Sequence, residues 1–217
     1  MSDYSLQPQH TAVFGMTGSG KTTFVIRYLL NDDSAACRFI FDDLNLMAPR
    51  LKLPLCCTPD DLEASLPTRW SAFNPIKILP QFGGDMKKAF RWWLRWVNHV
   101  AARGPGKKMV VIPEVWRHCN PDSVPSELAL LAQAGRELNV EIIVDTQRPE
   151  MLNGSLTASL TEIILFRQMS PDARRATEKL LLETGAGFDA EQLRSLPLGS
   201  FVGFNRLSGA SLAGKVF

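Results

Sequence analysis

Residues 15–22, Gly15-Met16-Thr17-Gly18-Ser19-Gly20-Lys21-Thr22, decide the fold of this chain, because they match the pattern G-x-x-x-x-G-K-[S/T] throughout. The apolar residues 11–14 come directly before the motif and predict a short strand. An apolar stretch of helical length follows it and predicts a helix to about Asn31. Strand, glycine-rich loop and helix in this order are the context that the motif requires. A chance glycine-rich turn is therefore the weaker interpretation.

The residue types of this loop suit a phosphate-binding site. Glycines let the backbone turn several N–H groups toward one concavity, and the following helix adds the positive end of its dipole. Lys21 can reach the β- and γ-phosphates of a nucleoside triphosphate, and the Thr22 hydroxyl can bind Mg²⁺. The residues expected to bind the nucleotide are Gly15, Met16, Thr17, Gly18, Ser19, Gly20, Lys21, Thr22 and Thr23.

The composition is that of an ordinary globular protein. The chain has 217 residues, of which 45% are hydrophobic and 21% charged, and this length suits one α/β domain. The net charge is only +2, so a nucleic-acid surface would have to come from local clusters of basic residues. The polar N-terminus predicts no secretion signal, and no apolar run approaches the roughly 20 residues that would predict a transmembrane segment.

The four cysteines show no C-x-x-C spacing, which favours reduced thiols in an intracellular setting. Cys56, Cys57, His118 and Cys119 could in principle form a zinc site. Because these residues lack paired spacing, ordinary buried thiols are the preferred interpretation.

Strands and helices alternate along the rest of the chain. The expected strands are residues 11–14, 38–41, 76–79, 109–112, 140–146 and 161–166. The expected helices after the loop are residues 60–65, 85–102, 127–138 and 171–185, the first capped by Thr58, and the last opened by Ser170 and closed by Gly185. Residues 44–75 are rich in proline and are otherwise expected to be irregular, and residues 200–217 predict a C-terminal β-hairpin. The alternation predicts an α/β fold with a mostly parallel sheet and helices on both faces.

Polar residues follow several of these strands, at the edge of the sheet where the glycine-rich loop places a nucleotide. They are Asp42-Asp43, Glu114, Gln147 and Arg167-Gln168. Glu114 follows a fully apolar strand and is the leading candidate for a general base that orients a water toward the γ-phosphate. The alternative for Glu114 is a solvated loop acid.

A second motif is more specific than the glycine-rich loop. Residues 135–149 read Gly135-Arg136-ELNVEIIVD-Thr146-Gln147-Arg148-Pro149, and this stretch resembles the FtsK/HerA superfamily of hexameric DNA-pumping ATPases, whose members carry Gly-Arg followed by a strand that ends in Thr-Gln-Arg-Pro. Together with the loop and the Glu114 strand, the resemblance covers most of residues 11–176 in the same order. It implies a RecA-like P-loop NTPase of the ASCE type, a single ATPase domain over residues 1–217, and ATP with Mg²⁺ as cofactors.

The resemblance also implies roles for individual residues. Gln147 would be the polar sensor that contacts the γ-phosphate or the attacking water. Arg136, or one of Arg174 and Arg175, would reach the nucleotide of a neighbouring subunit as an arginine finger, since a guanidinium stays charged and binds phosphate oxygens in pairs. A surface salt bridge is the alternative for each of these arginines.

One position departs from the pattern of the superfamily, whose members usually carry Asp-Glu after the apolar strand, with the Asp supporting Mg²⁺. This chain has Pro113-Glu114, and proline cannot hold a metal-bound water. Either a nearby acid (Asp42, Asp43 or Asp145) replaces the missing Asp, with Asp42 acting indirectly, or Mg²⁺ is held by Thr22, phosphates and water alone. We therefore expect Pro113 to affect the rate of ATP hydrolysis more than the affinity for the nucleotide.

Residues 87–108 contain seven Lys or Arg and no Asp or Glu, interleaved with Trp92, Trp93 and Trp96. Basic residues among aromatic ones fit a surface that follows a phosphate backbone, although the tryptophans fit packing into a core better. The residues expected to bind DNA are Lys87, Lys88, Arg91 and Arg95.

In its motifs and its small size, the chain resembles the genome-packaging ATPases of membrane-containing icosahedral bacteriophages. They imply a homo-oligomeric ring, a hexamer, that translocates double-stranded DNA in the host cytoplasm or at the packaging vertex of the virion, with capsid or membrane vertex proteins as partners. One alternative is a related DNA motor in conjugation or DNA-end processing. Another is an ATP-binding structural or assembly protein at a capsid vertex that hydrolyses ATP weakly, and Pro113 motivates it.

Overall fold

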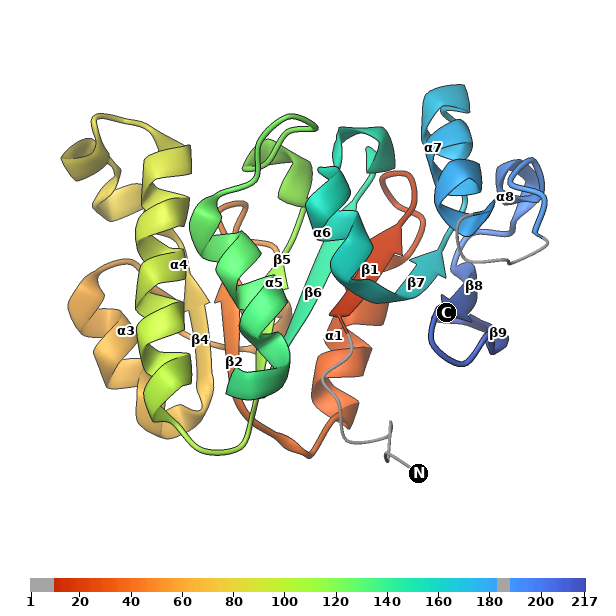
Figure 1. Ribbon diagram of the computed structural model, residues 1–217. Coiled ribbons are helices and arrows are strands. Elements are labelled where there is room, and N and C mark those ends of the chain that lie inside the picture. Colours follow the sequence, from red (N-terminus) through yellow and green to blue (C-terminus); the bar gives the residue numbers. More distant parts are fainter. Residues whose placement is uncertain (1–9, 183–187) are drawn as a thin grey trace. The chain divides into compact units, whose positions relative to one another are not determined.

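The computed structural model describes residues 10–182 and 188–217 of an α/β protein with a mostly parallel sheet (Figure 1). The described chain forms two compact units. One consists of Tyr28–Pro113 and Pro125–Ile142, and the other of residues 10–27, Glu114–Val124 and Ile143–Phe217. The expectation of a single ATPase domain over residues 1–217 stays a prediction, and the expected helix end at Gly185 lies outside the described residues.

In the first unit, four parallel strands lie in the order β3-β4-β2-β5. These strands are β3 (Leu55–Cys56), β4 (Trp70–Phe73), β2 (Ala35–Phe41) and β5 (Lys107–Ile112). The helices are α2 (Ala48–Leu51), α3 (Pro59–Ser65), α4 (Met86–Arg103) and α5 (Ser126–Leu138). Apolar residues three and four positions apart put one face of α4 into the core, and its buried residues are Ala89, Phe90, Trp93, Leu94, Val97 and Ala101.

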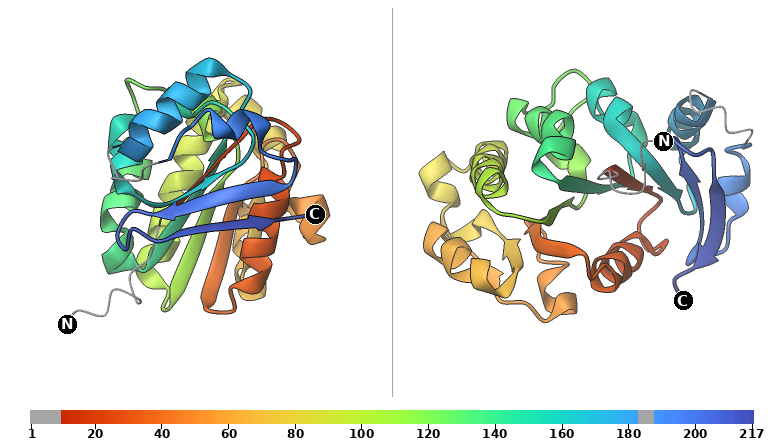
Figure 2. Two further views of the ribbon diagram at one scale, coloured as in Figure 1. Left: turned by 90° about the vertical axis from the view of Figure 1, so that its right-hand side faces the viewer. Right: turned by 60° about the horizontal axis from the view of Figure 1, so that its bottom comes forward.

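In the second unit, the strand order is β6-β1-β7-β8-β9. The strands are β6 (Val140–Thr146), β1 (His10–Phe14), β7 (Leu160–Leu165), β8 (Ser200–Asn205) and β9 (Ser211–Lys215), and the helices are α1 (Lys21–Asn31), α6 (Gly154–Ser159), α7 (Pro171–Leu182) and α8 (Gln192–Ser195). β6, β1 and β7 are parallel, whereas β8 and β9 are antiparallel. The predicted hairpin is therefore confirmed, and Figure 2 shows it from the side.

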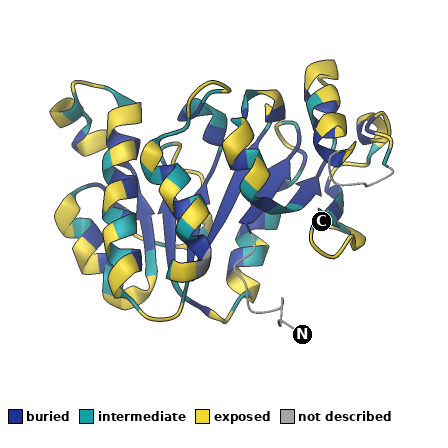
Figure 3. Cartoon of the chain, in the orientation of Figure 1, coloured by how far each residue is buried: buried dark blue, intermediate teal, exposed yellow. Residues whose placement is uncertain are grey.

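The register of β1 fixes where the polar residues after each strand lie. Phe14, the last residue of β1, is level with Thr146 of β6 and with Leu165 of β7. Every residue of β1 is buried, as the dark strands of Figure 3 illustrate. The glycine-rich loop, Gln147 and the residues after β7 therefore leave the sheet at one edge.

The proline-rich region differs most from the sequence prediction. The expected strand at residues 76–79 is wrong: Pro75–Lys77 form a 3₁₀ turn, because the Asn74 side chain accepts a hydrogen bond from the Ile76 N–H at 3.0 Å and Pro75 opens the turn. The strand nearest to this place is β4, which begins and ends six residues earlier, so the expectation of an irregular segment was also wrong there. The helix cap is confirmed, since Thr58 and Asp61 form a reciprocal capping box.

No helix in the part of the chain that the structure describes is long and apolar enough to span a membrane.

Candidate nucleotide-binding site

The glycine-rich loop joins β1 to α1 and is tied to the neighbouring strand ends. The Gly15 N–H donates to the Thr146 carbonyl at 3.2 Å, and the Met16 N–H donates to the Arg167 carbonyl at 2.8 Å. Gly18 and Gly20 have φ values of 76° and 115°, a region that side chains strongly disfavour. A Cβ built on Gly20 would lie 2.8 Å from Cγ2 of Val216, so glycine is required there on both counts.

Lys21, the first residue of α1, is buried within the site. Its Nζ donates to the Gly15 carbonyl at 2.9 Å and to the Met16 carbonyl at 3.3 Å. It also lies 3.6 Å from Oε1 of Glu114. The ammonium group is thus held over the concavity of the loop, between the backbone and the candidate base.

Glu114 follows Pro113 in a left-handed conformation, with φ 45° and ψ 50°. Such a conformation is strained for glutamate and persists only where its surroundings enforce it. Here the Glu114 N–H donates to Oδ1 of Asp145 at 3.0 Å. Its own Oε2 accepts from Nε1 of Trp116 at 2.8 Å and from the Gln147 N–H at 3.3 Å. These bonds hold the carboxylate in one orientation, with Oε1 facing Lys21.

Gln147 is linked directly to the loop. Its Oε1 accepts from the Thr17 hydroxyl at 2.8 Å, so the side chain reaches the loop residue next to Met16. The guanidinium of Arg148 lies 4.5 Å from the ring centroid of Trp116, which also binds Glu114. The structure thus brings Lys21, Glu114 and Gln147 together as the sequence predicts. It adds Trp116 and Arg148, which the sequence analysis did not predict. The sequence indicates them only weakly, because Trp116 is two residues after Glu114 and Arg148 directly follows Gln147.

Asp145 is a buried acid at the centre of this network. Burial raises the pKa of its carboxyl to about 6, although attraction to Lys21 works in the opposite direction. Because it accepts the Glu114 N–H, Asp145 stabilises the turn that follows Pro113. Of the acids that could replace the missing Asp at position 113, it is the one that directly bonds the Glu114 backbone.

The raised pKa predicts how stability depends on pH. The folded state holds the Asp145 proton more tightly than the unfolded chain does, so this contribution is full at low pH and is lost as pH rises through about 6. The free energy of unfolding of the nucleotide-free wild type, relative to that of Asp145→Asn, should therefore be about 1.4 kcal/mol higher at pH 5 than at pH 8. Urea unfolding at both pH values measures it. Asp122→Asn, at an exposed acid of the same unit, is the control, and equal differences for Asp145→Asn at both pH values would contradict the prediction.

Asp42 uses its carboxylate for its own loop. It is 1% exposed, and its two oxygens accept four hydrogen bonds of 2.8 to 3.1 Å from the N–H groups of Leu46, Met47 and Ala48. The side chain therefore shapes the turn after β2, which is a sufficient reason for an acid at this position.

The donors present suit Mg²⁺ that arrives with a nucleotide. Among the described residues, no group of three His, Cys, Asp or Glu is placed to hold a metal ion by itself. Mg²⁺ usually keeps several waters and is bound by one or two protein oxygens together with phosphates. The sequence motif makes the Thr22 hydroxyl, at the start of α1, the protein group that would hold such an ion, and Glu114 and Asp145 are the acids bonded to each other in the described site.

The three candidate arginines have different surroundings. Arg174 is 8% exposed at its side chain and is bound within the chain, to Oε1 of Glu191 at 2.9 Å and to the Met169 carbonyl at 2.7 Å. Arg175 is 74% exposed and pairs with Asp172, three residues earlier in α7 and 68% exposed. Arg136 lies in α5, and its side chain is not among those that the structure describes.

The basic face of α4 has acidic partners that its own sequence lacks. Glu127 of α5 lies 3.2 Å from Arg91 and 2.8 Å from Arg95, and Glu63 of α3 accepts from Nε1 of Trp96 at 2.7 Å. Residues 87–108 contain no acid, but Glu127 offsets the charges of Arg91 and Arg95, so the expected DNA contact loses its support at these two residues. Lys87 and Lys88, at the exposed start of the helix, are the stronger remaining candidates for DNA contact.

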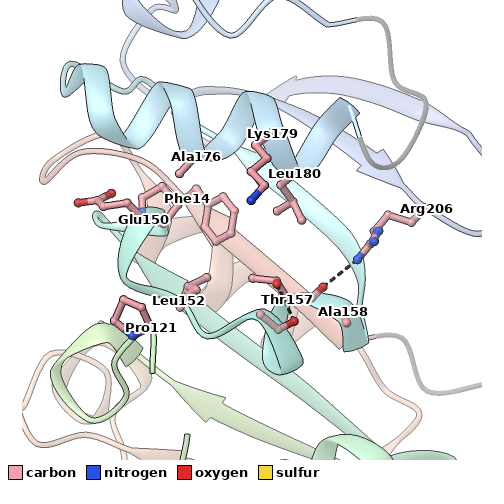
Figure 4. A pocket seen from close by; sticks show the side chains of 12 residues that line it. Phe14, Pro121, Glu150, Leu152, Thr157, Ala158, Ala176, Lys179, Leu180 and Arg206 are labelled. Atoms are coloured by element: carbon pink, nitrogen blue, oxygen red, sulfur yellow. Dashed lines mark hydrogen bonds between the residues drawn. The ribbon is translucent and has the colours of Figure 1, made fainter. Parts of the chain in front are cut away.

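Two hollows lie near the site in the second unit. One, of about 460 Å³, is lined by Met16, Gln147 and Arg148 and by the start of α7. The other, of about 490 Å³, lies between α6 and α7, and Figure 4 shows Phe14 and Leu180 on its apolar side, with Lys179 and Arg206 nearby. Met16 and Gln147 place the first hollow beside the glycine-rich loop.

No protein-family model and no curated protein sequence matches the chain. Solved structures do. The chain is similar to the genome-packaging NTPase B204 of Sulfolobus turreted icosahedral virus 2 in complex with ATP-gammaS, at 17% identity and a TM-score of 0.71 over 96% of this chain and 97% of that one. It is also similar to VirB4 of Thermoanaerobacter pseudethanolicus, at 11% identity and a TM-score of 0.66 over 96% and 89%. A third match is the pCW3 conjugation coupling protein TcpA, at 14% identity and a TM-score of 0.56 over 96% and 60%. The chain therefore has the fold of the genome-packaging NTPase B204, of VirB4 and of the conjugation coupling protein TcpA, and the α/β fold expected from the sequence is confirmed.

Proposed function

We propose that this chain hydrolyses ATP and uses the energy to translocate double-stranded DNA, as a viral genome-packaging ATPase. The observation that carries the proposal is the position of Glu114, whose carboxylate lies 3.6 Å from Nζ of Lys21 and accepts the N–H of Gln147. A fixed carboxylate beside a phosphate-binding lysine and a polar sensor is the arrangement that γ-phosphate hydrolysis needs.

Each residue has a distinct role in this proposal. The loop N–H groups bind the β-phosphate, and Lys21 leaves the carbonyls of Gly15 and Met16 to neutralise the β- and γ-phosphates. Glu114 accepts a proton from the attacking water, and Gln147 orients that water or the γ-phosphate. Asp145 acts through Glu114 by holding its backbone, so it is a positioning residue. Thr22 would hold Mg²⁺ through its hydroxyl, and the ion would supply positive charge for the phosphates.

In this proposal, a neighbouring subunit supplies an arginine side chain that completes the site. Arg175 is the arginine of the α7 pair that is free to cross an interface, because Arg174 is committed to Glu191 and to backbone carbonyls of its own chain. A ring of identical subunits, a hexamer, places such an arginine at every site. Lys87 and Lys88 are our candidates for contact with the DNA backbone.

The packaging assignment is supported by the fold match to B204, which extends over 96% of this chain and 97% of that one. The matches to VirB4 and TcpA support a conjugation motor as the second candidate. Genes for capsid proteins beside this one would favour packaging, with capsid or membrane vertex proteins as partners and the host cytoplasm or virion vertex as the location. Relaxase genes would favour conjugation.

The experiment is ATP-dependent displacement of a triplex-forming oligonucleotide from double-stranded DNA. A motor strips the third strand only when ATP is hydrolysed, so the wild type should release it with ATP and retain it with a non-hydrolysable analogue. DNA should also stimulate ATP hydrolysis. ATP hydrolysis that is absent or indifferent to DNA, with no displacement, would contradict the proposal and would favour the weakly hydrolysing assembly protein.

Lys21→Ala should weaken ATP binding roughly 10- to 100-fold, because charge-assisted hydrogen bonds to the phosphates are lost. Lys179→Ala, at an exposed lysine of α7 in the same unit, is the matched control and should bind ATP as the wild type does. Isothermal titration calorimetry with each protein measures both affinities. Unchanged ATP affinity in Lys21→Ala would show that the nucleotide binds elsewhere.

A further inference from the structure

The contacts of the glycine-rich loop give a bound triphosphate a direction. Glu114 and Gln147 mark the γ-phosphate end, through Lys21 and Thr17. A triphosphate held along the loop in this direction would place its α-phosphate, ribose and base at the other end, toward Ser19, Gly20 and the start of α1. The protein segment that packs beside Ser19 and Gly20 is therefore the one that the base would contact.

The C-terminal segment lies there. The Gly199 N–H donates to the Ser19 carbonyl at 3.0 Å, and the Val216 N–H donates to the Gly199 carbonyl at 2.9 Å. Val216 is 3% exposed and is so close to Gly20 that a Cβ there would come within 2.8 Å of it. Figure 2 shows the end of this hairpin beside α1. The segment is thus bonded to the loop at the end opposite the catalytic carboxylate.

Two large apolar side chains of this segment remain exposed next to the loop. Phe217 is 66% exposed and Leu198 is 48% exposed. The ring of Phe217 lies against Gly199, where a Cβ would be 2.6 Å from Cε2 of the ring, and Gly199 has a φ of 78°. The close approach of ring and backbone fixes the ring beside the residue that bonds Ser19, while most of its surface faces outward.

We propose that Phe217, together with Leu198 of the segment that its ring packs on, is the platform on which the nucleobase of the bound nucleotide stacks. An aromatic face gains stacking energy from a purine, and the exposed area of these side chains would be covered only when the base is bound. This inference rests on the proposed function, since it requires a nucleoside triphosphate in the loop. It names the contacts that distinguish a nucleotide from a bare polyphosphate.

The test compares ATP with inorganic tripolyphosphate, which has the phosphates and lacks the base. Phe217→Ala should weaken ATP binding about tenfold and leave tripolyphosphate binding unchanged. Phe217→Trp should keep ATP affinity, because it keeps an aromatic face. Phe217→Leu, which keeps apolar packing on Gly199 but has no aromatic face, should behave like Phe217→Ala. Calorimetric titration of each variant gives the affinities, and thermal unfolding verifies that each is folded.

Leu207→Ala provides the matched control, since Leu207 is 50% exposed in the turn between β8 and β9. It should bind both ligands as the wild type does. If Phe217→Ala loses ATP and tripolyphosphate equally, the ring supports the loop and the inference is overturned; unchanged ATP affinity in Phe217→Leu and Phe217→Ala also overturns it. If the wild type bound neither ATP nor tripolyphosphate, the result would instead contradict the proposed ATPase function.

Discussion

Glu114→Gln should lower the rate of ATP hydrolysis by roughly 10²- to 10⁴-fold, because an amide cannot accept the proton of the attacking water. The amide oxygen can still accept the hydrogen bonds from Trp116 and Gln147, so the geometry of the loop is kept. ATP affinity should be unchanged or higher, since Lys21 loses the ion pair that competes with the phosphates. The variant therefore separates the chemical step from binding.

Single-turnover hydrolysis with enzyme in excess over ATP measures the chemical step, and calorimetric titration measures the affinity. Glu178→Gln is the matched control, because Glu178 is an exposed acid of α7 in the same unit and has no place in our mechanism. A single-turnover rate within tenfold of the wild type would mean that another group takes the proton. A parallel loss of ATP affinity would mean that Glu114 holds the loop together instead.

The sequence predicts the parts of this site that lie within continuous patterns. The loop, its strand and its helix share residues 11–31, and residues 140–149 carry a strand and its polar end together, so both were placed correctly. Where a residue depends on a partner far along the chain, the sequence gives little. The ion pairs of Arg91 and Arg95 need Glu127, which is 36 and 32 residues away and on another helix.

Local competition explains the remaining errors. The apolar residues 76–79 resemble a strand, yet Asn74 and Pro75 fix a turn, and the preceding four residues of β4 pair with β2 instead. Asp145 appears in sequence as one of several acids near the nucleotide. Only the structure shows that its carboxylate accepts the Glu114 N–H, and that Pro113 is followed by a left-handed residue.

Arg175→Ala should reduce the rate of ATP hydrolysis by the assembled protein roughly 10³-fold, which is the lower range for the loss of an arginine finger. The change costs the isolated chain little, because Arg175 is 74% exposed and its local pair with Asp172 contributes little to stability. Arg174→Ala is the contrasting variant. It removes a buried side chain bound to Glu191 and Met169, so it should lower the unfolding temperature.

Mixing two inactive variants tests whether Arg175 acts across an interface. The Glu114→Gln subunit lacks the base but keeps Arg175, whereas the Arg175→Ala subunit keeps the base. In a ring assembled at random from equal amounts, about a quarter of the interfaces join an intact base to an intact arginine from the neighbour. The mixture should therefore hydrolyse ATP far faster than either parent. If Arg175 served the nucleotide of its own subunit, mixing the two variants could not restore hydrolysis. A mixture as inactive as its parents would therefore show that Arg175 does not act across an interface.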